Sequence, residues 1–111
     1  MRLTQKQRFS GSQAIRRMIA SGRIKSSVCS HLGEIQDVQP SAEGCEDCLK
    51  IGDTWVHLRI CLTCGHVGCC DNSKNKHATR HFHESGHPLI QSFEPGEEWL
   101  WCYTEQVLIT F

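Results

Sequence analysis

The chain contains eight cysteines and seven histidines in 111 residues, and this density limits its fold more than any other feature. Two Cys-x2-Cys pairs, Cys45/Cys48 and Cys61/Cys64, are separated by twelve residues. Such pairs are typical of zinc sites, because a two-residue turn lets both thiolates bind one ion at about 2.3 Å. The other candidate ligands are Cys29, His31, Cys69, His77, His81, His87 and Cys102. The sequence therefore predicts a small domain folded around zinc.

Disulfide bonds and iron–sulfur clusters account for the cysteines less well than zinc does. Disulfide bonds would need an oxidising compartment, and they would leave the histidines without a role. Iron–sulfur clusters use mainly thiolates, whereas imidazole combined with thiolate in tetrahedral geometry is typical of zinc. No apolar run approaches the roughly 20 residues that span a bilayer, and the start of the chain lacks the apolar core of a secretory signal. We therefore expect a soluble, cytoplasmic protein with no membrane partner.

The segment 73–86 predicts a helix that carries metal ligands, with a polar cap at its start and a glycine at its end. His77 and His81 share one face of this helix because they are four residues apart. The proline that follows directs His87 into extended chain, so its side chain can return toward the same metal region. His83 lies about 200° around the helix from His81. We therefore expect His83 at the surface.

Four further segments predict strands, because apolar and polar residues alternate along them between turn-forming residues. These strands are 55–61, 88–93, 98–104 and 106–111. In the third, Trp99, Trp101 and Tyr103 face one side of the sheet and Cys102 faces the other. The predicted fold class is therefore α+β, a small zinc-stabilised domain with an antiparallel sheet and one main helix.

The charges are divided unevenly, although the chain carries twelve basic and twelve acidic residues. Residues 1–27 have a net charge of about +7 and contain no acid, against about −7 for residues 28–111. We expect residues 1–27 to form a flexible basic arm with a short helix around Ile15, Met18 and Ile19, and residues 28–111 to form the zinc finger domain. The arm could also contact phosphates or serve as a mitochondrial transit peptide. Alternatively, translation could start at Met18.

The order of these motifs resembles the UBP-type zinc finger, a ubiquitin-binding module of deubiquitinases, a histone deacetylase and an E3 ligase family. The resemblance covers residues 29–105, including both Cys-x2-Cys pairs and the Trp-Cys-Tyr triplet at 101–103. The segments 55–59, 64–71 and 77–83 are particularly similar to small stand-alone bacterial members. The family topology implies cross-braced zinc sites, in which ligands from alternate segments share an ion.

The resemblance also implies how the ligands are divided among the ions. One set is Cys45, Cys48, Cys69 and His77, and the other is Cys61, Cys64, His81 and His87. A third family site would use Cys29, His31 and Cys102 with a further Cys three residues later, where this chain has Glu105. The Glu105 carboxylate could complete that site, or the site could keep three protein ligands and a water. We therefore expect two zinc ions and consider a third.

In ubiquitin-binding members, an Arg after a Cys-Gly step holds the C-terminal carboxylate of ubiquitin. Aromatic residues that correspond to Trp55, Trp101 and Tyr103 line the channel for the tail. In this chain, Cys70 and Asp71 stand at the Gly and Arg positions. An acid at about 4 Å repels a carboxylate by on the order of 1 kcal/mol in water. The resemblance thus implies a non-catalytic module for a protein or peptide tail, while Asp71 argues against ubiquitin.

Three further functions are alternatives. A zinc ion at an open Cys29/His31/Cys102 site could activate water, with Glu105 as base, which would make the protein a metalloenzyme. Cys70, which the zinc assignment leaves free, could act as a thiol redox sensor. The basic arm could bind nucleic acid, although the acidic remainder of the chain argues against it.

Overall fold

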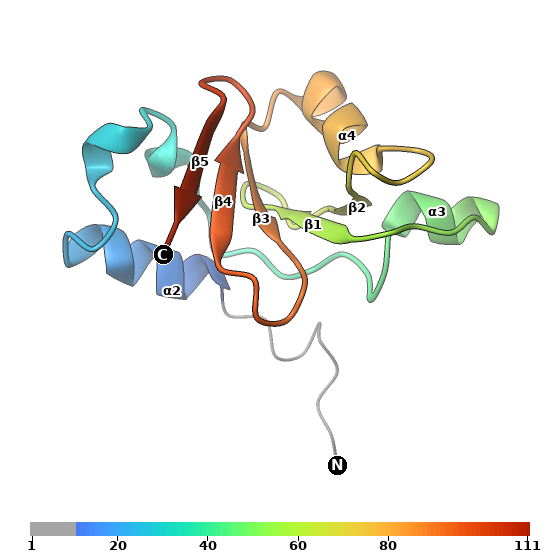
Figure 1. Ribbon diagram of the computed structural model, residues 1–111, viewed down its shortest axis with the longest axis horizontal. Coiled ribbons are helices and arrows are strands. Elements are labelled where there is room, and N and C mark those ends of the chain that lie inside the picture. The colour runs from blue at the N-terminus through green and yellow to red at the C-terminus, as the bar shows by residue number, and fades with distance from the viewer. Residues whose placement is uncertain (1–10) are drawn as a thin grey trace, which may run out of the picture.

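A computed structural model describes residues 11–111 and shows one five-stranded antiparallel sheet with the strand order β2-β1-β3-β4-β5 (Figure 1). The strands are β1 (Leu58–Cys61), β2 (Val67–Cys69), β3 (Leu89–Ser92), β4 (Trp99–Cys102) and β5 (Val107–Thr110). The helices are α2 (Gly11–Ala20), α3 (Glu46–Ile51) and α4 (His77–Ser85), with short 3₁₀ turns η1 (Ser26–Val28) and η2 (Leu32–Glu34). No helix in this range is long and apolar enough to cross a membrane. The α+β fold class is confirmed.

The predicted secondary structure differs from the observed structure mainly near the metal-ligand motifs. Each of the four predicted strands is present but shorter, and β2 is not predicted, because three residues with a central glycine show no alternation. The main helix ends at Gly86 as expected, where the backbone is left-handed with φ 76°. The helix begins only at His77, because the preceding residue, Lys76, has a left-handed backbone conformation with φ 51°, which does not continue a right-handed helix.

Helix α3 is not predicted by the sequence patterns. The first Cys-x2-Cys pair lies on this helix, whereas its spacing predicts a two-residue turn. Cys45 is the N-cap residue, and its Sγ accepts a hydrogen bond from the backbone N–H of Cys48. Gly52, with φ 70°, ends the helix after six residues. A helix this short is not stable alone in water, so tertiary contacts must hold it.

One face of the sheet carries the apolar core, which we call the core face. Leu100 of β4 and Ile109 of β5 are paired across the strands and pack with Ile15 of α2 in a first apolar cluster. A second apolar cluster surrounds Ile60 and Val67 and also contains three of the candidate ligand cysteines. Several candidate metal-ligand residues are therefore core residues as well.

The expectation of a flexible arm over residues 1–27 is wrong for residues 11–27. The short helix predicted around Ile15 is present as α2, and Ile15 is fully buried in the first apolar cluster. Ile24 is 3% exposed in the same cluster. The segment packs on the domain despite its excess of basic residues, because the apolar side chains are buried while the basic side chains project from the exposed side of the helix. The expectation for residues 1–10 lies outside the described residues.

Gly68 lets α4 lie directly on the opposite face of the sheet. A Cβ atom at this position would lie 2.7 Å from the backbone nitrogen of Ala78 and 2.9 Å from its Cα. Any larger residue would push the start of α4 away from β2. Because α4 begins at the candidate ligand His77, this close approach also sets the position of a ligand relative to the sheet.

We expect Gly68→Ala to lower the free energy of unfolding by about 1–3 kcal/mol, because overpacking against fixed backbone costs that much. Chemical denaturation of the zinc-loaded protein measures this change. Gly33→Ala is the matched control, since a Cβ atom there meets nothing within 4 Å. Equal effects of the two substitutions would contradict the close packing of α4 on β2.

Candidate metal centres and an aromatic pocket

Four ligand atoms converge where α3, β2 and the start of α4 meet. The Sγ atoms of Cys45, Cys48 and Cys69 lie 3.2, 3.3 and 3.5 Å from Nδ1 of His77. All four ligand atoms lie within 4.8 Å of one another, and all four residues are buried. We call these residues the first metal cluster. It joins a helix, a strand and a second helix that are distant in the sequence.

The distances within the first metal cluster suit a tetrahedral zinc ion. Zinc bonds of about 2.3 Å to sulfur and about 2.0–2.1 Å to nitrogen place neighbouring ligand atoms about 3.3–3.8 Å apart. The backbone N–H groups of Cys48 and His77 donate to the Sγ atoms of Cys45 and Cys69, at 3.4 and 3.2 Å. Burial raises the pKa of Cys45 to about 12. A metal cation is therefore needed to stabilise its thiolate.

A second metal cluster combines Cys61, Cys64, His81 and His87. The Cys61 Sγ lies 3.6 Å from Nδ1 of His87, and the Cys64 Sγ lies 3.3 Å from Nε2 of His81. Burial raises the pKa of Cys61 to about 11, so this thiolate also needs a cation. Helix α4 supplies His77 to the first cluster and His81 to the second, so one helix connects both metal clusters.

His66 connects the second metal cluster to helix α3, a role that no sequence motif predicts. Its ring stacks on the ring of His81, with centroids 4.2 Å apart. Its Nε2 lies 2.7 Å from Oδ2 of Asp47 on α3. Burial raises the pKa of Asp47, but the hydrogen bond and charge of His66 lower it more, so the net shift is downward. Only the tertiary contact reveals this role, because His66 lies in no spaced ligand motif.

The third group, Cys29, His31 and Cys102, also comes together. Nδ1 of His31 lies 3.8 Å from the Cys29 Sγ and 3.6 Å from the Cys102 Sγ. Glu105 Oε1 lies 3.3 Å from the same Nδ1 atom. The Ser30 hydroxyl and backbone N–H both donate to this carboxylate, and they lower its pKa. The three ligand atoms of Cys29, His31 and Cys102 lie within 4.8 Å of one another, which suits a metal ion with two sulfur ligands and one nitrogen ligand, whereas Glu105 approaches only the His31 side of this group.

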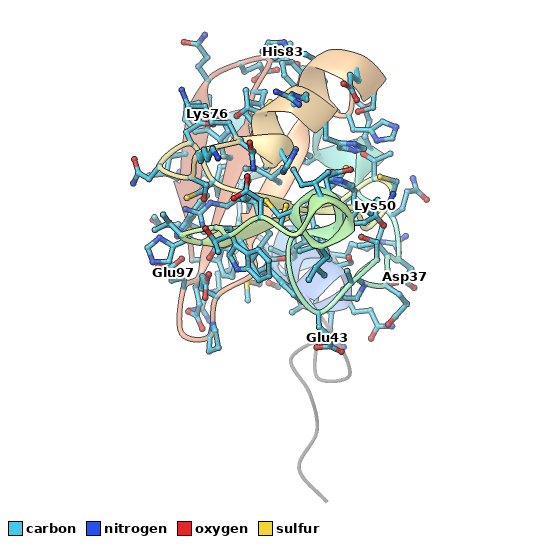
Figure 2. All side chains as sticks on the ribbon, turned by 90° about the vertical axis from the view of Figure 1, so that its right-hand side faces the viewer. Asp37, Glu43, Lys50, Lys76, His83 and Glu97 are labelled. Carbon is cyan, nitrogen blue, oxygen red and sulfur yellow. The ribbon has the colours of Figure 1, made fainter. Side chains whose placement is uncertain are left out.

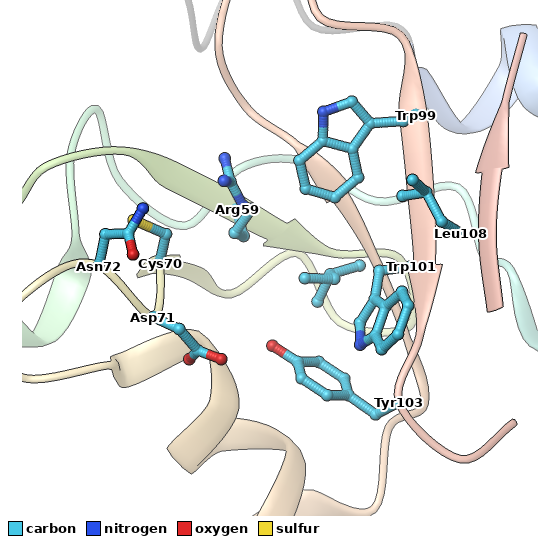
Figure 3. Close-up of a pocket in the computed structure, with 9 residues that line it drawn as sticks. Arg59, Cys70, Asp71, Asn72, Trp99, Trp101, Tyr103 and Leu108 are labelled. Carbon is cyan, nitrogen blue, oxygen red and sulfur yellow. The ribbon is translucent and has the colours of Figure 1, made fainter. Parts of the chain in front are cut away.

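An aromatic pocket of about 270 Å³ opens on the face of the sheet opposite the core face (Figure 3). Trp101 of β4 pairs with Ile90 of β3 and Leu108 of β5, and all three line it. The remaining lining residues are Arg59, Cys70, Asp71, Asn72, Trp99 and Tyr103. Of these, Trp99 and Asn72 were not predicted as binding residues. The alternation along 98–104 places Trp99 on the same face as Trp101 and could have identified it.

The expectation that Trp55 lines this pocket with Trp101 and Tyr103 is wrong. Trp55 is absent from the pocket lining and packs instead on the second apolar cluster. A Cβ atom on Gly44 would lie 2.5 Å from the Trp55 indole, so the glycine makes room for this ring. The physical reason is that β1 begins at Leu58, so strand alternation does not determine where Trp55 points.

The two charged residues in the pocket differ in how their charges are satisfied. Arg59 is 4.6 Å above the Trp99 ring and 3.8 Å from Glu97, and its Nη1 donates to a backbone carbonyl. Asp71 is exposed, and its Oδ1 accepts a hydrogen bond of 2.6 Å from the Thr79 hydroxyl. No cation among the described residues lies within ion-pair distance of Asp71.

Cys70 and His83 belong to none of the metal-ligand groups that the described residues form. Cys70 is buried, and its Sγ lies 3.5 Å from the Ser73 hydroxyl. Burial raises the pKa of Cys70, but the hydrogen bond with Ser73, two backbone hydrogen bonds and the charge of Arg59 lower it below its ordinary value. His83 is exposed on α4 (Figure 2).

Comparison with known proteins gives several matches. A family profile described as Zn-finger in ubiquitin-hydrolases and other protein matches residues 45–110. Ubiquitin carboxyl-terminal hydrolase 44 from Ailuropoda melanoleuca is 33% identical over 81 residues, which cover 68% of this chain and 10% of that protein. NAD-dependent deacetylase sir2A from Dictyostelium discoideum is 38% identical over 60 residues, 54% of this chain and 10% of that protein. The chain thus spans about a tenth of these curated relatives.

A solved bacterial structure is also similar. The solution NMR structure of protein RPA1320 from Rhodopseudomonas palustris is 62% identical, with a TM-score of 0.69, and the match covers 74% of this chain and 80% of that chain. This match agrees with the resemblance to small bacterial members. The profile match spans more than half of the chain and includes both metal clusters. The chain therefore belongs to the UBP-type family of zinc fingers, which occur in ubiquitin hydrolases and other proteins.

Proposed function

We propose that the protein is a non-catalytic, zinc-stabilised interaction module that binds a peptide tail of a protein partner in the aromatic pocket. The observation that carries this proposal is the pocket, where Trp99, Trp101 and Tyr103 remain only half-buried around a cavity of about 270 Å³. Aromatic side chains offer large contact areas at low entropic cost, so they are common at binding sites. A reducing cytoplasm, which keeps thiolates available for zinc, suits such a module.

The proposed zinc ligands are directly connected to the pocket walls. Cys69 in the first metal cluster precedes Cys70 and Asp71, and Cys102 in the third group lies between Trp101 and Tyr103. A binding site works best when rigid neighbours hold its side chains in place. The metal ions would therefore stabilise the pocket as well as the fold.

The proposed ligation supports a structural role for zinc. We assign one ion to each of the two four-residue clusters, and a third to Cys29, His31 and Cys102 with Glu105 as fourth ligand. Closed tetrahedral sets leave no position for a reacting water, whereas catalytic zinc keeps one open. The hydrogen bonds from Ser30 hold the Glu105 carboxylate near His31, and we therefore propose it as a ligand rather than as a base. A metalloenzyme is therefore not our proposal.

We expect freshly purified, reduced protein to contain three zinc ions by native mass spectrometry, and complete removal by a chelator to unfold the domain. Glu105→Ala should lose its third ion to chelator before wild type does, because one of four ligands is missing. Glu105→Cys is the matched control and should retain it. A content of two zinc ions would contradict the third site, and a content of one or none, or native-like NMR dispersion after demetallation, would contradict the whole assignment.

We expect Cys45→Ser and His81→Ala to lose a zinc ion and to disrupt folding, because each removes one bond from a closed ligand set. Cys70→Ser and His83→Ala are the matched controls and should leave zinc content and melting temperature nearly unchanged. Zinc analysis and thermal unfolding of the four variants measure these effects. If Cys70→Ser lost a zinc ion, the ligand assignment at Cys69 would be wrong.

The pocket gives a reason to expect little affinity for ubiquitin. Asp71 stands where the ubiquitin-binding members of the family have the Arg that binds the terminal carboxylate, and no cation pairs with it among the described residues. Losing one half of such a charge pair costs about 2–5 kcal/mol, or roughly 30-fold to several-thousand-fold in affinity. Asp71 adds repulsion to that loss.

We therefore expect a peptide that ends in the ubiquitin tail to bind this protein far more weakly than it binds the ubiquitin-binding members of the family, or not detectably. Titration of fluorescently labelled protein with the free-acid peptide and its C-terminally amidated form measures this. The two forms should behave alike. Low-micromolar binding that disappears on amidation would restore ubiquitin as the partner.

A further inference from the structure

We propose that the aromatic pocket recognises an ammonium group, supplied by a lysine side chain or by the free N-terminus of a peptide. This inference rests on the proposed peptide-binding function and names the chemical group that the pocket selects. It follows from the direction of the hydrogen bonds at Asp71, from the contacts that Arg59 already makes within the protein, and from the aromatic surface between these two charged residues.

The hydrogen bonds at Asp71 leave acceptor atoms facing the pocket. The Thr79 hydroxyl has one proton and donates it to Asp71 Oδ1 at 2.6 Å. The Tyr103 hydroxyl, 3.1 Å from Thr79 Oγ1, must then donate its own proton to Thr79. The remaining lone pairs on Tyr103 and Asp71 can only accept hydrogen bonds. Figure 3 shows the Asp71 carboxylate and the Tyr103 hydroxyl close together at one end of the pocket.

Arg59, the positively charged residue of the pocket, already has contacts within the protein. The Arg59 guanidinium lies over the Trp99 ring, donates to the carbonyl of Leu58 at 3.0 Å, and lies 3.8 Å from Glu97. Asp71 has no such cationic partner among the described residues. At its Asp71 end the pocket therefore presents a carboxylate without a cationic partner, which attracts a cation and disfavours a second carboxylate.

The aromatic rings suit the same ligand. Phe82 stacks on one face of Tyr103, with centroids 4.6 Å apart and planes 9° apart, so a ligand in the pocket can meet Tyr103 only at its other face or its edge. Trp101 lies beside Tyr103 on the pocket wall. The π faces of Tyr and Trp attract ammonium groups, and an ammonium group has three donors and no acceptor. The acceptors on Asp71 and Tyr103, together with the rings of Tyr103 and Trp101, therefore suit an ammonium group.

The test follows the indole N–H signals of Trp99 and Trp101 by NMR, in zinc-loaded, ¹⁵N-labelled protein titrated with four short peptides. One carries a lysine between blocked termini, and one has a free N-terminus and an amidated C-terminus. One is the first peptide with its lysine acetylated, and one has a blocked N-terminus and a free carboxylate. The first two should shift the indole signals, and the comparison between them identifies which ammonium source is preferred. The other two should not shift the signals.

Asp71→Asn provides the matched variant, because the amide oxygen can still accept from Thr79 while the charge is lost. Its affinity for the ammonium peptides should fall at least about fivefold. Asp37→Asn removes the same charge from an exposed residue outside the pocket and should have no effect. Undiminished affinity in Asp71→Asn would overturn the proposal, as would preference for the carboxylate peptide. Binding of the carboxylate peptide would leave the peptide-binding function intact, whereas indole signals unmoved by all four peptides would overturn both.

Discussion

The proposed bonds between buried thiolates and zinc are the interaction on which we expect the rest of the fold to depend. Cys45, Cys48 and Cys69 occupy the second apolar cluster, where aliphatic side chains would otherwise provide the packing. Helix α3 has six residues and β2 has three, and elements of that length do not persist without tertiary support. The proposed ligation provides that support, because each short element carries at least one ligand. Metal binding and folding are then one process.

Helix α4 makes the two metal clusters mechanically dependent on each other. It supplies His77 to the first cluster and His81, one turn later, to the second. The contact of Gly68 with its first turn holds the helix on the sheet, and the His66–Asp47 contact connects the second cluster back to α3. The geometry of both ligand groups therefore depends on where α4 lies on the sheet.

The metal framework and the pocket chemistry are separate properties of this chain. The metal clusters agree with the ligand sets that the family resemblance implies, whereas the residues next to them define a pocket of different charge. Asp71 and Arg59 illustrate this, since the acid is unpaired among the described residues and the guanidinium is engaged by Trp99 and Glu97. A shared scaffold with an altered pocket supports recognition of a ligand other than a carboxylate tail.

The sequence by itself determined that the domain is a zinc finger, the positions of four strands and the end of α4 at Gly86. These features follow from local rules: ligand spacing, side-chain alternation and the freedom of glycine at positive φ. The division of ligands into clusters came from family resemblance, because spacing alone does not reveal which segments meet in space. Only the tertiary structure decided that Trp55 packs against the second apolar cluster, that α2 packs on the sheet, and that Thr79 connects Tyr103 to Asp71. Each of these depends on contacts between residues distant in sequence, whose packing and hydrogen bonds local patterns do not encode.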